Sequence, residues 1–283
     1  MTTRPQIGVH ISGAKSLDLS FERAREIGCT TFQIFTRNPR MWRFSPLTDE
    51  QVTSFKEARK KTGFRTVVAH MPYLPNLSSS ESATMKISRY TLSEEVKRCD
   101  SLGIDHLVTH LGSHLGKGTM VGVKNVADAL RQALEGSSGR TRVLLENMAG
   151  QKNSVGSRFE ELRMILDRVP QEGRTGVCLD TCHAYASGFD LSGPEAVEES
   201  MSLFDQTVGK ESLGVVHLND SKGGLGDRLD RHEFVGEGKI GRRGMRAILH
   251  HPAIRDRPLI METPFEDEES MRRSLSVARS LIR

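Results

Sequence analysis

The 283-residue sequence has little cysteine and no long apolar run. Its four cysteines are Cys29, Cys99, Cys178 and Cys182, and they form no Cys-x-x-Cys pair. This pattern argues against a disulfide framework and against a thiolate zinc site of the usual spacing. No apolar run approaches the roughly 20 residues of a membrane span, and no basic leader precedes an apolar core at the N-terminus. We therefore expect a cytoplasmic protein without a membrane segment.

The sequence also lacks a strong excess of charge of either sign. Lys and Arg number 40 against 36 Asp and Glu, which gives a net charge of +4. This charge permits a polyanionic partner without requiring one. Apolar residues make up 36% and charged residues 27%, as in a globular rather than a disordered protein. No glycine-rich dinucleotide or P-loop fingerprint is present. Composition alone therefore leaves the function open.

Eight short β-type runs recur along the whole chain, with helix-type spacing between them. They span residues 7–12, 31–35, 65–70, 106–112, 142–148, 175–181, 213–220 and 258–264. Most are too apolar to alternate, which is typical of parallel strands buried on both faces. No Pro-rich or Ser-rich linker divides the chain. The pattern predicts an α/β fold, a single (β/α)8 TIM barrel forming one domain over residues 1–283, with a doubly wound open sheet as the alternative.

Local signals place several of the helices and the longest loop. Capping boxes at Thr48-x-x-Gln51 and Ser157-x-x-Glu160 predict two helix starts. The longest irregular stretch, residues 221–238, follows the seventh predicted strand. In a barrel, this loop lies at the carboxyl ends of the strands, where active sites are built.

Histidine or acidic residues stand at the carboxyl ends of six predicted strands, and an Asp-x-His pair lies in the loop after the seventh. These nine candidate ligands are His70, His110, Glu146, Asp180, His183, His217, Asp230, His232 and Glu262. A carboxylate behind an apolar run is costly to bury unless it is paired, protonated or bound to metal. One histidine ending a strand is more often structural, but nine separate structural explanations would have to coincide. We expect a metal cluster at the barrel mouth.

Nine ligands are too many for one catalytic zinc, which usually takes three protein ligands and water, so they indicate two or three ions. The mixture of imidazole and carboxylate suits Zn²⁺ or Mn²⁺. Cys182 lies between two candidates and could bind zinc, but its position favours a packing role. We assign no metal to His10, which ends the first strand, or to His106, which starts the fourth strand at the opposite end of the barrel.

The segment after the second predicted strand reads TRNPRMWRF, with three arginines around the only tryptophan, Trp42. Basic residues interleaved with flat apolar ones suit nucleic-acid contact through phosphates and stacking. The same residues could equally form a solvated basic loop with Trp42 packed on the barrel rim. This segment does not decide between the two on its own.

The sequence resembles endonuclease IV, the zinc-dependent apurinic/apyrimidinic (AP) endonuclease family of base excision repair, over essentially its full length. The resemblance lies in the segments HMPYLPNLSS (70–79), THLGSH (109–114), LLENMAG (144–150), GVCLDTCH (176–183), VHLNDSKGGLGDRLDRHEFVGEG (216–238) and METPF (261–265). Each segment contains at least one of the nine candidate ligands.

The resemblance implies three Zn²⁺ per chain, with Mn²⁺ able to replace zinc at one site. It gives His70, His110 and Glu146 to one ion, with Glu146 bridging to the second. It gives Asp180, His217 and Glu262 to that second ion. His183, Asp230 and His232 would hold the third.

The resemblance also implies the reaction, in which Glu146 is the residue we expect to be essential. The family hydrolyses the phosphodiester 5′ to an abasic site in double-stranded DNA, leaving a 3′-hydroxyl and a 5′-deoxyribose phosphate. It also removes blocking groups from 3′ ends, and its members act as monomers. Extrusion of a sugar without a base to unpair offers a source of selectivity.

For DNA contact, the resemblance points to side chains inserted at the lesion. These are Arg40, Met41, Tyr73 and Leu74, where Met41 replaces a glutamine found in some members. Weaker candidates for DNA contact are Arg37, Trp42, Lys222, Arg228 and Arg231.

Two other functions fit part of this pattern. A metal-dependent sugar isomerase or epimerase of the xylose isomerase-like barrel class would share the fold and the strand-end ligands, but with fewer histidines. A metal-dependent DNA-binding protein without catalysis would need the basic loop but no bridging carboxylate. The set His183, Asp230 and His232 favours the nuclease over the first, and Glu146 favours it over the second.

Overall fold

The computed structural model describes residues 5–169, 173–262, 264 and 267–283. Its main sheet has eight parallel strands that follow the predicted runs, each shorter than predicted. Residue 263 of the last predicted run lies outside the described residues. The strands are β1 (Ile7–Val9), β2 (Phe32–Ile34), β3 (Val67–His70), β4 (His106–Thr109), β5 (Arg142–Glu146), β6 (Thr175–Asp180), β7 (Leu213–His217) and β10 (Leu259–Met261). The predicted strands are therefore confirmed.

The sheet closes into a barrel rather than staying open. The strand order is β1-β10-β7-β6-β5-β4-β3-β2, so neighbours in the sheet are neighbours in the chain and no reversal point of a doubly wound sheet occurs. The two ends of this order meet through a parallel bridge between His10 and Gln33. The Ile11 N–H donates to the Gln33 carbonyl at 2.7 Å across the same seam. The barrel prediction is confirmed.

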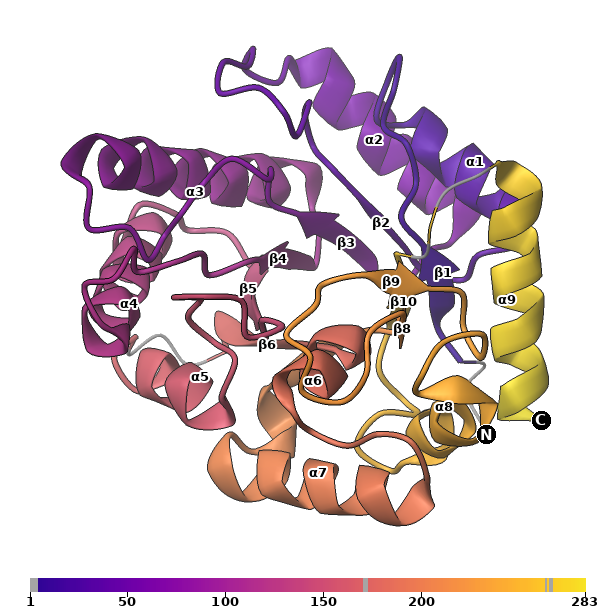
Figure 1. Ribbon diagram of the computed structural model, residues 1–283. Coiled ribbons are helices and arrows are strands. Elements are labelled where there is room, and N and C mark those ends of the chain that lie inside the picture. The colour runs from indigo at the N-terminus through magenta and orange to yellow at the C-terminus, as the bar shows by residue number, and fades with distance from the viewer. Residues whose placement is uncertain (1–4, 170–172, 263, 265–266) are drawn as a thin grey trace.

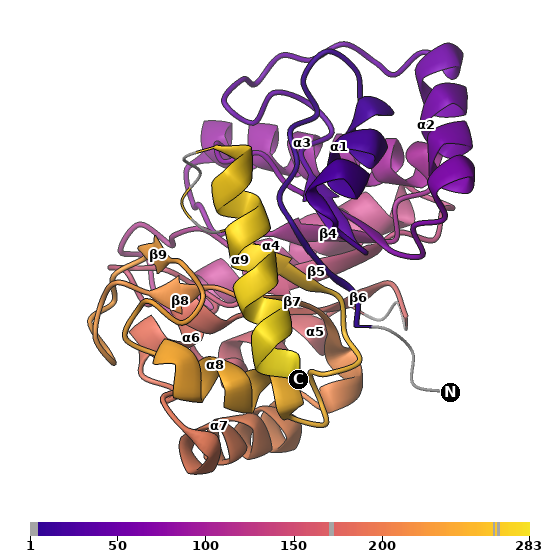
Figure 2. The same ribbon diagram turned by 90° about the vertical axis from the view of Figure 1, so that its right-hand side faces the viewer.

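Helices surround the strands as a ring (Figure 1). They are α1 (Leu19–Ile27), α2 (Asp49–Thr62), α3 (Ser82–Leu102), α4 (Thr119–Glu135), α5 (Phe159–Leu166), α7 (Pro194–Thr207), α8 (Gly241–His250) and α9 (Glu268–Ile282). The short helix α6 (Thr181–Ser187) and a small hairpin, β8 (Asp220–Ser221) with β9 (His232–Glu233), lie over one end of the barrel (Figures 1 and 2). No described helix has the length and apolarity that crossing a membrane would require.

Of the two predicted capping boxes, one is confirmed and one is wrong. Thr48 and Gln51 cap α2 reciprocally, as predicted. Ser157 does not cap α5, because that helix begins one residue later with Arg158 at its N-cap position. The Glu161 carboxylate instead accepts a hydrogen bond of 2.6 Å from the Gly156 N–H. A carboxylate in the first turn satisfies a backbone donor near the helix start without a hydroxyl cap.

A small apolar layer fills the inside of the barrel. It contains one fully buried residue from each of six strands, namely Val68, Val108, Leu144, Cys178, Val215 and Ile260. A larger cluster packs the outer faces of the strands against the helices. Because side chains alternate along a strand, the residue two positions after each inner residue also points inward, one layer nearer the carboxyl ends.

Candidate metal centre

Six of the nine candidate ligands form the layer directly above the apolar layer. Two positions after its six members stand His70, His110, Glu146, Asp180, His217 and Glu262. Glu146, Asp180 and His217 are 0% exposed, and His70 is 3% exposed. The period of two along a strand therefore explains why these residues face one another at the barrel mouth.

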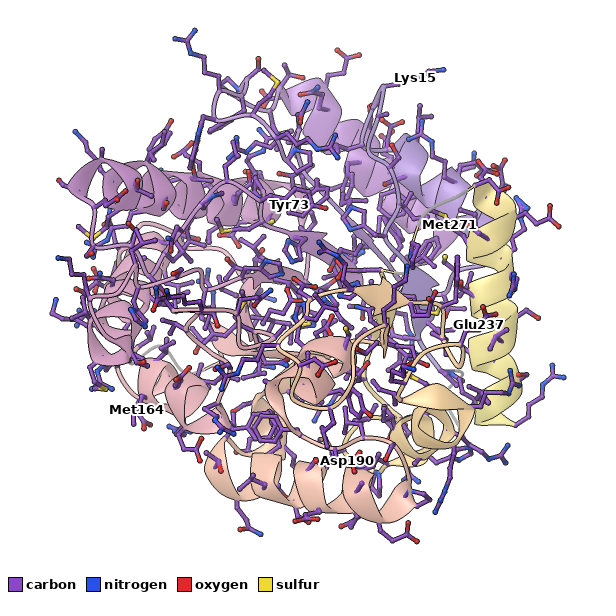
Figure 3. The ribbon with its side chains drawn as sticks, in the orientation of Figure 1. Lys15, Tyr73, Met164, Asp190, Glu237 and Met271 are labelled. Carbon is purple, nitrogen blue, oxygen red and sulfur yellow. The ribbon has the colours of Figure 1, made fainter. Side chains whose placement is uncertain are left out.

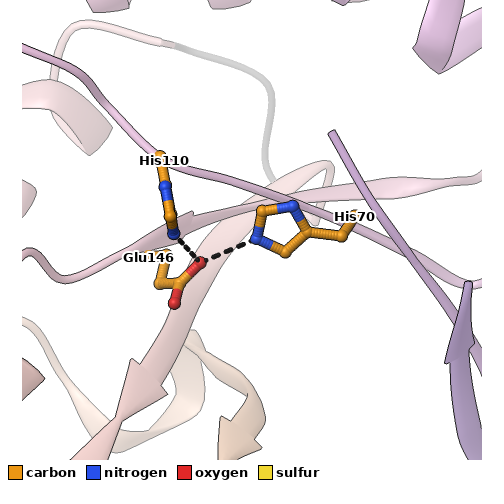
Figure 4. A group of neighbouring side chains, drawn as sticks. All are labelled: His70, His110 and Glu146. Carbon is orange, nitrogen blue, oxygen red and sulfur yellow. Dashed lines mark hydrogen bonds and ion pairs between the residues drawn. The ribbon is translucent and has the colours of Figure 1, made fainter. Parts of the chain in front are cut away.

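The first group of ligands comprises His70, His110 and Glu146 (Figure 4). The Nε2 atoms of His70 and His110 lie 2.9 and 3.1 Å from Oε2 of Glu146. Nδ1 of His70 lies 2.7 Å from the Met71 carbonyl oxygen. Since a carbonyl only accepts, this Nδ1 carries the proton and Nε2 is the ring's ligand atom when the ring is neutral.

The second group comprises Glu146, Asp180, His217 and Glu262. Nδ1 of His217 lies 3.1 Å from Oε1 of Glu146, 3.1 Å from Oε2 of Glu262 and 3.9 Å from Oδ2 of Asp180. Glu146 therefore presents one carboxylate oxygen to the first group and the other to the second. This is the arrangement of a carboxylate that bridges two ions.

The third group comprises His183, Asp230 and His232. His183 comes from α6, while Asp230 and His232 come from the long segment after β7. Oδ1 of Asp230 lies 3.1 Å from Nε2 of His183 and 3.6 Å from Nε2 of His232. Both Nε2 atoms are buried and make no hydrogen bond within the described residues. Both Nδ1 atoms face backbone carbonyls, those of Asn147 at 2.9 Å and Glu262 at 3.0 Å.

These distances fit zinc-type ions. Two ligand atoms that each lie about 2.1 Å from a tetrahedral zinc ion are roughly 3.4 Å apart from each other. The separations between the candidate ligand atoms given above lie between 2.9 and 3.9 Å. The Nε2 atoms of His183 and His232 are a second sign, because both are buried and face carboxylate oxygens without making a well-formed hydrogen bond among the described residues. The three groups could each hold a metal ion.

The carboxylates and imidazoles of the centre shift one another's pKa values. Burial opposes ionisation of Glu146, but His110 and His217 outweigh it and hold its pKa well below the usual range. Burial likewise opposes protonation of His183, but Asp180, Asp230 and Glu146 outweigh it and raise its pKa to about 10. Metal ions would replace these protons.

Cys182 also lies within reach of Asp180 and His232. Its thiol faces the Arg231 carbonyl oxygen at 3.6 Å, and burial raises its pKa to about 12. A metal ligand must be a thiolate. This geometry favours the packing role expected from the sequence.

Three polar residues that the sequence analysis missed hold the ligands in place. Gln33 accepts from Nε2 of His217 at 2.9 Å and donates to Oε1 of Glu262 at 2.6 Å. Asn219 donates to Oδ2 of Asp180 at 2.6 Å. Asn147 accepts from the Asp180 N–H at 2.7 Å. Asn147 directly follows Glu146, and Asn219 stands two residues after His217. Gln33 is a polar residue inside an apolar run, which is the kind of signal that singled out Glu146.

A cavity of about 970 Å³ leads from this centre to the rim of the barrel. His110, His183 and Glu262 line its inner part, and Arg40 and Tyr73 line the outer part. Tyr73, labelled in Figure 3, is 58% exposed. Met41, which follows Arg40, is 52% exposed, and Leu74, which follows Tyr73, is 37% exposed. Large side chains with apolar surface are thus exposed at the rim.

Arg37, expected to contact DNA, points into the protein instead. Its side chain is 5% exposed and paired with Glu95 of α3, which is fully buried. The guanidinium donates to the Met41 and Trp42 carbonyls at 3.0 and 3.2 Å and lies 4.3 Å from the Phe44 ring centroid. Arg37 therefore holds the loop from inside, because the buried Glu95 charge needs a partner.

The remaining candidates for DNA contact lie on loops at the barrel mouth. Arg40, Lys222, Arg228 and Arg231 are exposed, and Trp42 is partly buried. Lys222 lies 3.9 Å from the Glu233 carboxylate, and the Arg231 guanidinium donates to the Asp230 carbonyl at 2.9 Å. All four cations are nevertheless exposed at this end of the barrel.

Comparisons with known proteins agree with this architecture. The family model described as xylose isomerase-like TIM barrel matches residues 21–281. The chain is 46% identical to a probable endonuclease 4 from Cenarchaeum symbiosum (strain A), covering 98% of this chain and 99% of the relative. The crystal structure of endonuclease IV from Thermus thermophilus has a TM-score of 0.87 at 36% identity, covering 98% of this chain and 99% of that one. A D-tagatose 3-epimerase-like protein, at 19% identity and a TM-score of 0.69, covers 97% and 98% and shares the fold alone. With this identity over nearly the whole length and with the strand-end groups described above, the chain belongs to the endonuclease IV family.

Proposed function

We propose that the protein is a zinc-dependent AP endonuclease that hydrolyses the phosphodiester 5′ to an abasic site in double-stranded DNA. The products are a 3′-hydroxyl and a 5′-deoxyribose phosphate, and blocked 3′ ends are further substrates. The observation that carries the proposal is the position of Glu146, whose two oxygens face two different groups of ligands. Two adjoining ions around a shared carboxylate are typical of phosphodiester hydrolysis.

In this proposal, the whole chain is one domain that acts as a monomer and holds three ions. His70, His110 and Glu146 hold the first, and Glu146, Asp180, His217 and Glu262 the second. His183, Asp230 and His232 hold the third. Bound zinc would lower the pKa of water and neutralise phosphate charge, and Mn²⁺ could take the place of zinc at one site.

The chain's own residues bind and orient the DNA. The rim residues Met41, Tyr73 and Leu74 are apolar and exposed, which suits side chains wedged into the base stack at a lesion. Arg40 lies beside Tyr73 on the cavity wall and supplies a phosphate contact. The cavity between rim and ligands has room for an extruded sugar-phosphate.

A sugar isomerase or epimerase is the alternative within the same fold. Polarising a small sugar would employ the ions of the inner groups. The third group would then have no role, although it includes two buried imidazole nitrogens that face carboxylate oxygens without making a hydrogen bond among the described residues. This group favours the nuclease.

The proposal is tested with an end-labelled duplex that contains one tetrahydrofuran abasic analogue. This analogue cannot undergo β-elimination, so a cut 5′ to it reports hydrolysis. We expect cleavage by zinc-loaded protein and about three zinc ions per chain by elemental analysis. Absence of a cut by the metal-replete protein would overturn the proposed function.

Glu146→Gln provides the matched variant. We expect turnover to fall by at least about 1,000-fold, because the amide cannot bridge two cations as a carboxylate does. Glu160→Gln changes an exposed carboxylate of α5 and should leave cleavage unchanged. Equal activity of the two variants would contradict the bridging role.

A further inference from the structure

Asp220 is a fully buried carboxylate that is not among the nine candidate ligands. It follows β7, which ends at His217, and it begins the hairpin strand β8. Its two oxygens accept hydrogen bonds from the backbone N–H groups of Ser221 at 2.8 Å, Gly236 at 3.0 Å, Ile240 at 3.0 Å and Gly241 at 3.1 Å. A buried charge with this many donors needs an explanation beyond packing.

The four donors lie at, or one residue beyond, the two ends of one loop. The segment between β7 and α8, called here the β7–α8 loop (residues 218–240), leaves the barrel next to Asp220 and returns at Ile240. The Lys239 N–H also donates to the Ser221 carbonyl at 2.8 Å. A Cβ atom on Gly238 would lie 2.5 Å from Oδ1 of Asp220 and 2.5 Å from the Ser221 oxygen. The neck of the loop is therefore closed tightly around one carboxylate.

The tip of the same loop is tied to α6. The Gly226 N–H donates to the Tyr185 carbonyl at 3.1 Å, and the Arg228 N–H donates to the Ala186 carbonyl at 2.9 Å. The helix that accepts these bonds also carries His183. Between neck and tip lie Asp230 and His232, the other two members of the third group.

The hairpin connects the neck of the loop to His232. Ser221 of β8 pairs with His232 of β9 in antiparallel register, and the Lys222 N–H donates to the Arg231 carbonyl at 2.9 Å. Asp220 thus acts on His232 through a single pair of short strands. A displacement of the neck by about 1 Å would separate three ligand atoms that must converge on one ion.

We propose that Asp220 is a positioning residue for the third metal group and that it determines whether the ion held by His183, Asp230 and His232 is retained. The inference rests on the proposed function, since it assumes that this group binds metal. A carboxylate is needed at this position because it only accepts hydrogen bonds. An asparagine would turn an NH2 donor toward backbone donors and leave buried N–H groups unsatisfied.

The test compares Asp220→Asn with Asp227→Asn, the same substitution elsewhere in the same loop. Asp227 is exposed, and its carboxylate accepts from the Gly224 N–H at 2.6 Å. Each protein is loaded with zinc, dialysed against a weak chelator, and assayed for zinc per chain and for cleavage of the abasic duplex. We expect Asp220→Asn to lose one ion of three, and Asp227→Asn to keep all three. Titration with zinc should show about 10- to 100-fold weaker binding of that ion, with cleavage restored at high zinc.

Two outcomes would overturn the inference while leaving the proposed function intact. The first is that Asp220→Asn retains all three ions. The second is that Asp220→Asn loses all three ions equally while its circular dichroism is unchanged. Wild-type protein with fewer than three ions would overturn the proposed three-ion function together with the inference. If Asp220→Asn does not fold, Gly238→Ala disturbs the same neck, and a folded Gly238→Ala protein that keeps three ions overturns the inference.

Discussion

Gln33 is the polar residue on which two candidate ligands depend. Its amide oxygen accepts from His217 and its amide nitrogen donates to Glu262. Gln33→Met has a similar volume but removes both bonds, so we expect about 10- to 100-fold weaker zinc binding, measured by competition with a chelating dye. Gln132→Met, an exposed position on α4, is the control. Unchanged zinc affinity in Gln33→Met would mean that packing alone orients His217 and Glu262.

Metal binding should release protons. The raised pKa of His183 determines the direction in which zinc affinity changes with pH. Its pKa is raised to about 10 by Asp180, Asp230 and Glu146 against the effect of burial, and the pKa of His217 also lies well above its usual value. The protonated rings stabilise the metal-free fold fully below about pH 6.5, and this contribution disappears as pH rises through the folded pKa. Zinc must displace these protons, so its affinity should fall as pH falls.

Titration calorimetry in two buffers of different ionisation enthalpy measures this release. Because the pKa of His183 is raised to about 10 and that of His217 is raised as well, we expect at least one proton to be released per chain on full loading at pH 7. An observed enthalpy that does not depend on the buffer would show that the imidazoles are already neutral in the metal-free protein.

Some features of single residues could be predicted from the sequence, and others could not. The convergence of the six strand-end candidate ligands was predictable, because a carboxylate after an apolar strand needs a partner and the histidines stand at the equivalent positions of neighbouring strands. The spacing of two residues from the inner apolar layer carries the same information. The orientation of Arg37 was not predictable, because it depends on Glu95, which lies 58 residues away in the sequence.

At the scale of elements, α3 supports the rim loop through Glu95. Its carboxylate binds Arg37 and accepts from the Thr36 hydroxyl at 2.6 Å, and Arg37 in turn holds the Met41 carbonyl. We expect Glu95→Gln to raise the KM for abasic duplex about tenfold, because it weakens a buried charged hydrogen bond. The kcat at saturating DNA and the zinc content should change little.

Glu94→Gln is the control for this prediction. Glu94 pairs with Lys97 at the surface of the same helix, where an ion pair contributes little. If Glu95→Gln lowers kcat and zinc content while the KM stays constant, α3 supports the metal centre rather than the rim loop.

Elements that carry a periodic pattern were predictable, and those without one were not. All eight strands were expected, but each is shorter than its predicted run. The six strands that carry candidate ligands end at the ligand residue or one residue before it. The hairpin of β8 and β9 has two residues in each strand, too few to show alternation. Its position depends on Asp220, a residue whose partners lie up to 21 positions away. The sequence therefore predicted the loop's location at the barrel mouth but not its internal order.

At the scale of the whole molecule, the candidate ligands join distant parts of the chain. They extend from His70 on β3 to Glu262 just after β10, so bound ions would cross-link six strands, α6 and the β7–α8 loop. The seam between β1 and β2 is joined to the same network, because Gln33 contacts both His10 and Glu262. Metal binding and barrel stability should therefore be coupled.

Removal of the ions should lower the stability of the entire barrel. An ion present at about a thousandfold excess over its Kd stabilises the folded state by roughly 4 kcal/mol. Since about 1 kcal/mol shifts the Tm of a chain of this size class by roughly 2–4 °C, stripping with a strong chelator should lower the Tm by about 10 °C or more in scanning calorimetry. Glu146→Gln, which weakens two groups at once, should shift less on chelation. An unchanged Tm in protein shown to be free of metal would mean that the barrel is held by its apolar layers alone and that the ions serve only the reaction.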